Sequence, residues 1–357
     1  MQSNPTDVGL GCIDRRVLGA LSNEASLIYE PSPFGLSEAR EAVAGWYRSI
    51  GLSVRGERLL LTASSSEAYS FLLKLLCDPG DSILVPSPSY PLFDHLARLE
   101  CVSVDRYPLM EEDGWCVDEL ALRDAVQPTT RAIFLVSPNN PTGSYVHDGE
   151  LRVYEAVARE HDLVLVSDEV FAEYVWREAS DRVRCVALES RVPAFSLGGL
   201  SKSACMPQMK LGWIVMGDGV SRDVVRRLEM IADTYLSVSA PVQHAAKVFL
   251  DGARCARDLI AERIAVNLGV LRRLISGTCL SLGPVDAGWY GCLRVPAIMT
   301  DEEWAVMLVR HEGVLSHPGS FFGFGRAGTL VVGLIGQSDI FEEGVRRLVR
   351  RVELAVA

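Results

Sequence analysis

Apolar runs alternate with amphipathic segments through the first two thirds of the chain. Runs such as 132–136 (AIFLV) and 163–166 (LVLV) are apolar at every position, which is typical of strands covered on both faces. Helices are expected between several of these runs, as at 66–76 and 149–160. Seven strands are expected, at 58–62, 82–86, 102–106, 131–137, 163–167, 193–197 and 212–216.

This alternation predicts an α/β fold with a mostly parallel seven-stranded sheet and helices on both sides. A long helical region at 221–276 is expected to lead the chain out of that sheet. An amphipathic helix that begins at Ile340 ends the chain. Three further strand-like runs lie between them, at 280–282, 289–295 and 329–334.

Two domains are expected from this division. The large one would occupy 31–262, and a small α+β domain would combine 1–30 with 263–357. In open α/β sheets, ligands bind outside the carboxyl ends of the strands. Functional side chains are therefore expected where the strands of the large domain end.

Composition narrows the classes of function. The net charge of -11 and the pI near 5.1 disfavour a nucleic-acid binder, which needs a basic face. No apolar stretch approaches the roughly 20 residues that span a bilayer, and no secretory signal is visible at the N-terminus. The nine cysteines show no metal-binding spacing, so we expect reduced thiols, no metal site and a cytoplasmic protein.

A lysine in the segment 198–215 (GGLSKSACMPQMKLGWIV) is the first candidate for chemistry. A lone lysine is nearly always a solvated surface residue. Lys202, however, is surrounded by small and apolar residues, which would desolvate it and favour the neutral amine. Lys210 follows eight residues later, and the two cations suit a cofactor that carries an aldehyde and a phosphate.

Two further motifs follow strand-like runs. Asn140 lies in VSPNNPTGSYV, although asparagine and proline also favour turns for purely local reasons. Asp168 ends the apolar run LVLVSD. A buried carboxylate needs a strong partner, and a protonated pyridine nitrogen is one; the alternative is an aspartate that caps the following turn.

The last candidates are hydroxyl and aromatic residues. Ser65 and Ser66, in TASSSEAYS, lie at a strand-to-helix junction, where backbone N–H groups and the helix dipole favour a phosphate. With Glu67, the run Ser64 to Ser66 also matches an ordinary helix N-cap. Tyr90, in PSPSYP, suits stacking on a flat ring or packing in the core.

The order and spacing of these motifs carry more information than any one of them. SPNNPTG, then SDEVF, then LSK with a cation eight residues on, then GW, resemble the class I/II aminotransferase family of fold type I, which is aspartate aminotransferase-like. The resemblance runs through nearly the whole chain. It implies pyridoxal 5'-phosphate (PLP) as cofactor, with an amino acid and a 2-oxo acid as substrates.

The resemblance also assigns roles to residues. Lys202 would hold PLP as a Schiff base and move the proton on the substrate Cα, and Asp168 would keep the pyridine nitrogen protonated. Asn140 would donate to the phenolic oxygen of the ring, and Tyr90 would stack on the ring. The phosphate would be held by Ser65, Ser66 and Lys210.

The same resemblance implies a homodimer with shared active sites. Tyr29, in YEPSPFG, is similar to the tyrosine that reaches the phosphate of the neighbouring subunit.

Three positions depart from the family pattern near the cofactor. Where this chain has Phe171, Gly199 and Lys210, the family usually has Tyr, Ser and Arg, respectively. At position 210, a guanidinium that can donate two parallel hydrogen bonds is therefore replaced by an ammonium that acts as a point charge.

The largest departure lies in HPGSFFGFGRAGTLVVGLIG. The arginine with which the family clamps the substrate carboxylate is replaced by Val331, and Arg326 falls in the turn before that strand. Asn4, Thr6, Lys210 or water are the alternatives for orienting the substrate.

Transamination is therefore the first hypothesis. The missing arginine and Phe171 keep open a second, a PLP-dependent cyclase or eliminase that acts on a modified, basic amino acid in natural-product biosynthesis. A non-catalytic regulator is disfavoured, since no DNA-binding segment fits beside the fold. Four polar residues near the motifs are further candidates for lining the site, although a structural role is the favoured expectation for each: His95, Glu169, Tyr174 and His317.

Overall fold

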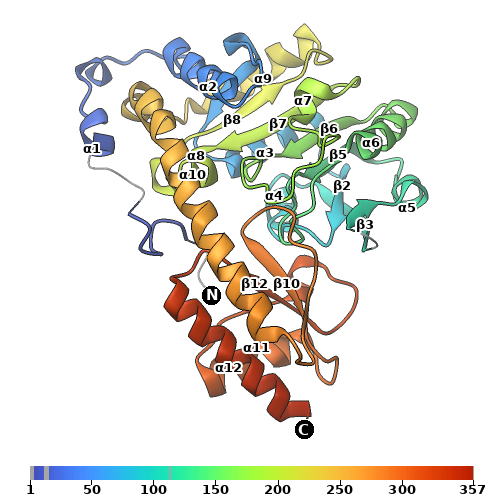
Figure 1. Ribbon diagram of the computed structural model, residues 1–357. Helices are drawn as coiled ribbons and strands as arrows, with labels where there is room; N and C mark the ends of the chain where they lie inside the picture. Colours follow the sequence, from blue (N-terminus) through green and yellow to red (C-terminus); the bar gives the residue numbers. More distant parts are fainter. Residues whose placement is uncertain (1–3, 12–15, 112–113, 357) are drawn as a thin grey trace.

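The computed structural model describes residues 4–11, 16–111 and 114–356. Two sheets are connected by one long helix, α10 (Ala240–Ile275), which runs from the upper to the lower part of the molecule in Figure 1. The large sheet has eight strands in the order β1-β8-β7-β6-β5-β2-β3-β4. The small sheet has four, in the order β11-β12-β10-β9.

All seven expected strands of the large sheet form. They are β1 (Leu59–Thr62), β2 (Ser82–Ser87), β3 (Ser103–Glu111), β5 (Thr130–Val136), β6 (Val164–Asp168), β7 (Ala194–Gly199) and β8 (Gly212–Met216). An eighth strand, β4 (Trp115–Val117), pairs with the end of β3 and was not predicted, since three half-buried residues leave no apolar pattern.

The direction of the strands decides where their ends meet. β3, β2, β5, β6 and β7 pair in parallel, whereas β8 is antiparallel to both of its neighbours, β7 and β1. β1 therefore runs in the same sense as β7. The carboxyl ends of β1, β2, β5, β6 and β7, together with the start of β8, open on one edge of the sheet, as the mostly parallel α/β prediction requires.

Helices cover both faces of this sheet (Figure 1). Along β5, Phe134 faces the core shared with α3 and α9, while Ile133 and Leu135 face the core shared with α5 and α6. This two-sided burial explains why the AIFLV run is apolar throughout. The helices of this part are α1 (Arg16–Ala20), α2 (Ser37–Ser49), α3 (Ser65–Leu76), α4 (Phe93–Leu99), α5 (Glu119–Asp124), α6 (Asp148–His161), α7 (Val186–Glu189), α8 (Leu200–Ser203) and α9 (Arg222–Tyr235).

The small sheet packs on the last two helices and on the lower part of α10. Its core contains Trp289, Trp304 and Phe341, and the N-terminal segment adds the buried Val8. The expected boundary at 262/263 falls inside α10, so the division into two domains stays a prediction. The elements are β9 (Ser281–Leu282), β10 (Tyr290–Arg294), β11 (His317–Pro318), β12 (Thr329–Gly333), α11 (Asp301–Glu312) and α12 (Ser338–Val356).

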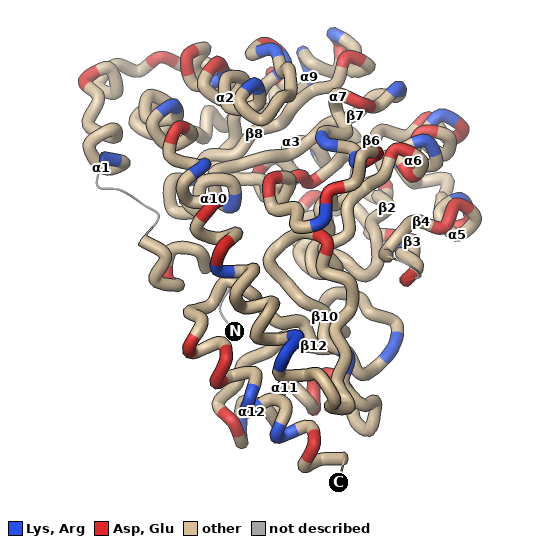
Figure 2. The backbone as a smooth tube through the Cα atoms, viewed as in Figure 1, with Lys and Arg blue, Asp and Glu red and all other residues tan. Residues whose placement is uncertain are grey.

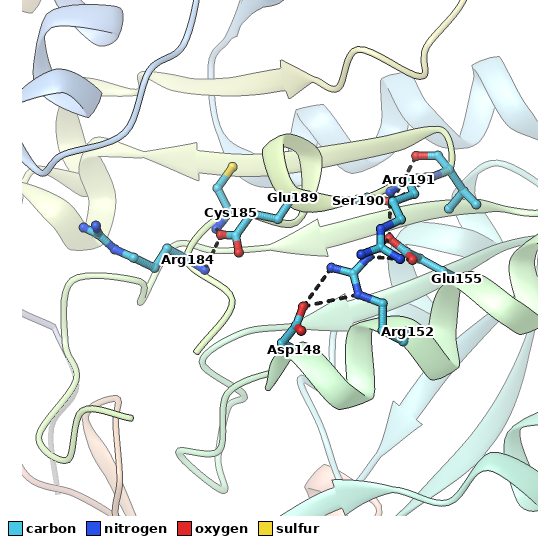
Figure 3. A network of polar contacts seen from close by, with 9 residues as sticks. Asp148, Arg152, Glu155, Arg184, Cys185, Glu189, Ser190 and Arg191 are labelled. Atoms are coloured by element: carbon cyan, nitrogen blue, oxygen red, sulfur yellow. Dashed lines mark hydrogen bonds and ion pairs between the residues drawn. The ribbon is translucent and has the colours of Figure 1, made fainter. Parts of the chain in front are cut away.

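Charged residues lie mainly along the outer helices, where positions of both signs are interspersed (Figure 2). One polar network ties α6 to the segment before β7 (Figure 3). In it, Arg152 bonds Asp148 at 2.8 Å and the buried Glu155 at 2.6 Å, and the Arg191 amide donates to Glu155. Within the described residues, no helix is long and apolar enough to cross a membrane.

Candidate active site

The fold brings the sequence motifs together at the carboxyl edge of the large sheet. Asp168 is the last residue of β6, Asn140 follows β5, and Tyr90 follows β2. Lys202 lies in the short helix α8, directly after β7. Four segments that are far apart along the chain thus supply the candidate site, as the parallel topology predicts.

The Lys202 amine lies beside two aromatic rings that contact each other. Its Nζ atom is 5.0 Å from the ring centre of Trp289 and 5.6 Å from that of Phe171. Burial lowers the pKa of the Lys202 ammonium, and the negative charge of Asp168 only partly opposes this. The Tyr174 hydroxyl donates to the Lys202 carbonyl at 2.7 Å and so fixes the turn that carries the lysine.

The chain has only four lysines, and they differ sharply. Lys74 pairs with Glu100, and Lys247 pairs with Asp251 on the surface. Lys210 is exposed. Among the four lysines, only Lys202 has a lowered pKa, which favours the neutral, nucleophilic form of the amine.

Asp168 is a buried carboxylate with neutral donors only. Tyr69 donates to its Oδ2 atom at 2.7 Å, and the Val170 amide donates to Oδ1 at 3.1 Å. Burial raises the pKa of Asp168, and these hydrogen bonds oppose that rise. No lysine or arginine among the described residues lies within ion-pair distance, so the carboxylate is available to a cationic ligand.

The sequence left open whether the asparagines of SPNNPTG form a turn or contact a ligand, and the two residues differ in this respect. Asn139 builds the turn, since it accepts from Ser89 at 2.6 Å and donates to Pro88 and Thr142. Asn140 is also buried, but its Oδ1 atom has no partner among the described residues. Its amide is therefore free to meet a ligand.

The start of α3 combines a helix cap with free amides. Ser64 accepts from the Glu67 amide at 3.2 Å, and Glu67 accepts from the Ala63 amide at 2.6 Å. The N-cap predicted for this segment is thus formed, with Ser64 as the capping residue. The amides of Ser65 and Ser66 lie in the first turn, where a helix offers no internal acceptor and an anion is favoured.

Gly212 lets β8 approach that turn closely. A Cβ atom at this position would lie 2.8 Å from the Ser64 carbonyl carbon and 3.0 Å from the Ser65 nitrogen. Lys210, at a φ of 54°, stands just before β8 at the same edge of the sheet. Ser65, Ser66 and Lys210 are therefore brought to one edge, as predicted.

The two predicted tyrosines differ in their placement. Tyr90 is half-buried, and burial, with the charge of Asp168 as a second cause, raises the pKa of its phenol. Tyr29 is 79% exposed and follows Leu27 and Ile28, which are 88% and 70% exposed. No contact between Tyr29 and the other predicted site residues is recorded in the described part of the chain.

Several residues at the site were not predicted from the sequence. Trp289 and Tyr69 contact the functional groups of Lys202 and Asp168. The WYG segment that opens β10 was the only signal for Trp289. Glu169 and Tyr174 have the expected structural roles, because Glu169 accepts from the Ser196 hydroxyl and the Val186 amide.

Comparisons with known proteins agree with this geometry. Residues 13–336 match the sequence model of the family described as aminotransferase class I and II. A tyrosine aminotransferase of Dictyostelium discoideum is 31% identical over 316 residues, which cover 82% of this chain and 73% of that protein. The glutamate-pyruvate aminotransferase AlaA of Escherichia coli K12 is 27% identical over 72% of this chain and 64% of its own length.

Solved structures share the fold. An alanine aminotransferase from Pyrococcus furiosus superimposes with a TM-score of 0.88 at 24% identity, covering 99% of this chain and 91% of that one. A tyrosine aminotransferase from Leishmania infantum gives 0.87 at 23% identity, over 99% and 90% of the two chains. The large mixed sheet with its smaller companion is therefore the fold type I arrangement.

Proposed function

The chain belongs to the class I and II aminotransferase family and is an aminotransferase, and we propose that it acts with PLP held by Lys202 as a Schiff base. The family match covers most of the chain. The observation that carries the assignment of Lys202 is its position: it directly follows β7 at the carboxyl edge of the sheet, beside Phe171 and Trp289, and among the four lysines it alone has a lowered pKa. A neutral amine there is suited to condense with an aldehyde.

The residues present fit this cofactor. Asp168 offers a buried negative charge without a protein cation, which suits a protonated ring nitrogen. The Oδ1 atom of buried Asn140 has no partner among the described residues, which supports a role of this side chain in binding a ligand. We propose that Ser65, Ser66 and Lys210 bind the phosphate, and that Tyr90 stacks on the ring.

In the proposed reaction, the cofactor supplies the electron withdrawal and Lys202 supplies the proton transfer. When bound, PLP withdraws electrons from the substrate Cα. Lys202 would accept the proton from Cα at its Nζ atom and deliver it to the cofactor carbon rather than back to Cα, which is what transamination requires; burial lowers the pKa of its ammonium and so favours the neutral amine. The ring centres of Phe171 and Trp289 lie 5.6 and 5.0 Å from this atom and provide an apolar surface beside it.

We further propose a cytoplasmic homodimer. The exposed Leu27, Ile28 and Tyr29 form a contiguous apolar segment that a second copy of the chain would cover. All eight described cysteines are free thiols, which suits a reducing compartment; Cys12 lies outside the described residues. In such a dimer, Tyr29 would contribute to the site of the partner.

The alternative of a cyclase or eliminase is not favoured, since the similar proteins are named as aminotransferases. The test is to incubate the purified holoprotein with single amino acids and no 2-oxo acid. We expect loss of the visible absorbance of the lysine-bound cofactor, together with one equivalent of the matching 2-oxo acid. A product that retains its nitrogen, formed while the absorbance persists, would contradict transamination. Lys202→Ala should abolish the response, and Lys247→Ala, on the surface, should not.

A further inference from the structure

Trp289 lies where the small sheet meets the candidate site. It directly precedes β10, and the backbone before it is held by two segments of the large domain. The Gly288 amide donates to the Tyr174 carbonyl at 2.7 Å. In the SPNNPTG turn, a Cβ atom on Gly143 would lie 2.4 Å from the Ala287 carbonyl oxygen. These contacts fix the position of Trp289 relative to the carboxyl edge of the large sheet.

The indole ring of Trp289 lies beside the amine that is proposed to bind the cofactor. The ring centre is 5.0 Å from the Lys202 Nζ atom. It is also 5.3 Å from the ring centre of Phe171 and 5.1 Å from that of Tyr174. Trp289 is 0% exposed. A hydrogen bond made by this indole would therefore form away from solvent, where such bonds are stronger.

The indole nitrogen of Trp289 differs from those of the other buried tryptophans. Its Nε1 atom is buried and has no hydrogen-bond partner among the described residues. An indole N–H can only donate, and a buried donor without an acceptor costs free energy. The two other buried tryptophans both have acceptors: Trp213 donates to a tyrosine hydroxyl and Trp304 to a backbone carbonyl, each at 3.0 Å. Trp289 is thus the exception, and it is the one at the candidate site.

We propose that Trp289 is a binding residue of the site, whose indole N–H donates a hydrogen bond to an anionic oxygen of the ligand held at Lys202. Two such oxygens belong to the ligands of an aminotransferase. PLP carries its phenolic oxygen on the ring carbon next to the one that bears the aldehyde, and an amino acid carries its carboxylate on the carbon next to its nitrogen. Hydrogen bonds to anionic oxygens are the stronger ones. The inference rests on the proposed function, because both oxygens come near Trp289 only if PLP is bound at Lys202.

The first test observes the indole N–H itself by NMR. The chain has six tryptophans, so nitrogen labelling of the indoles gives six N–H signals, and Trp289→Phe identifies that of Trp289 by its loss. We expect this signal of the holoprotein to move downfield in one of two experiments. One raises the pH through the midpoint of the cofactor absorbance, and the other adds the α-methyl analogue of the amino acid that discharges this absorbance, since that analogue has no Cα proton to lose. The signal of Trp304, which has its own acceptor, should stay in place. A Trp289 signal that moves in neither experiment would overturn the proposal.

Two further measurements on the holoprotein show which oxygen is bound. If it is the phenolic oxygen, Trp289→Phe should move the pH titration of the cofactor absorbance to higher pH, because the lost hydrogen bond stabilised the deprotonated form. If it is the substrate carboxylate, the titration should stay in place, and calorimetry should show roughly tenfold or more weaker binding of the α-methyl analogue. Trp304→Phe, which changes a buried tryptophan of the same core, should alter neither. Equal effects of the two variants, or no effect of Trp289→Phe on either measurement, would contradict the proposal.

The outcomes separate this inference from the proposed function. If an amino acid discharges the absorbance of the lysine-bound cofactor while the Trp289 signal never moves, the aminotransferase stands and the inference fails. If no amino acid discharges that absorbance, the proposed function fails, and the inference fails with it. If Trp289→Phe does not fold, the Trp289 signal is assigned by exclusion, with Phe placed in turn at each of the other five tryptophans, so that the wild-type spectra still decide.

Discussion

Two adjacent carboxylates, Asp168 at the end of β6 and Glu169 directly after it, have different partners. Asp168 accepts from Tyr69 at the base of the site, whereas Glu169 accepts from Ser196 and Val186. Burial raises the pKa of both, and brings that of Glu169 to about 7. Asp168 is thus available to a ligand, whereas Glu169 connects the end of β6 to Val186 and Ser196.

The raised pKa of Glu169 predicts a pH dependence of stability. Because its pKa is higher in the folded than in the unfolded protein, Glu169 favours folding at acidic pH. That contribution is lost as the pH rises from about 4.5 to about 7, at a cost of roughly 3 kcal/mol in the free energy of unfolding. Glu169→Gln should flatten the decline of Tm over this range. Glu353→Gln, at an exposed position, should not; equal slopes for all three proteins would contradict the assignment.

Asp168 carries a second prediction. Asp168→Asn keeps the shape but removes the charge that would hold a proton on the ring nitrogen, so the half-reaction rate should fall on the order of 100-fold. Tyr69→Phe keeps the carboxylate and removes only one hydrogen bond. Stopped-flow absorbance should therefore show a much smaller loss for Tyr69→Phe; a larger one would shift the central role from the charge to the hydrogen bond.

At the scale of single residues, the sequence predicted those candidate site residues that end a strand or follow one closely. Lys202, Asp168 and Asn140 were placed in this way, although their roles stay proposals. Trp289 and Tyr69 escaped prediction, because they reach the site from a distant strand and from inside a helix. From sequence alone, an aromatic residue among apolar neighbours is predicted to lie in the hydrophobic core, and only its tertiary contacts show that it borders a site.

At the scale of elements, the approach of β8 to α3 shapes the proposed phosphate site. Gly212→Ala would place a methyl group 2.8 Å from the Ser64 backbone and push the start of α3 away. We expect PLP affinity to fall about tenfold or more, as measured by equilibrium dialysis. Gly252→Ala is the matched control, since nothing lies within 4 Å of its added carbon, and alanine favours the interior of α10. Unchanged affinity in Gly212→Ala would contradict the phosphate assignment.

Helices and strands were predicted correctly where their burial produces a regular pattern of apolar residues in the sequence. The fully apolar strands and the helices α3, α6 and α12 were predicted within a few residues, whereas the helical region expected at 221–276 forms two helices, α9 and α10, with a break at 236–239. β4, β11 and α8 were not, because elements of two to four residues are fixed by their partners rather than by their own sequence. The short helix α8 matters most, since it sets the direction of Lys202.

At the scale of the whole molecule, the exposed segment Leu27–Tyr29 predicts self-association. Analytical ultracentrifugation should show a dimer, and Leu27→Asp with Ile28→Asp should shift the protein toward monomer. Leu354→Asp, which changes an exposed leucine on α12, should leave the mass unchanged. A monomeric wild-type protein would contradict both the dimer and the assigned role of Tyr29.

The central claim is that Lys202 binds the cofactor covalently, and one measurement tests it directly. The holoprotein would be reduced with borohydride, which fixes a lysine-linked PLP permanently, and its proteolytic peptides would be mapped by mass spectrometry. We predict a single phosphopyridoxyl group, on Lys202. Because the chain has only three other lysines, a label on Lys74, Lys210 or Lys247 instead, or no label at all, would contradict the account.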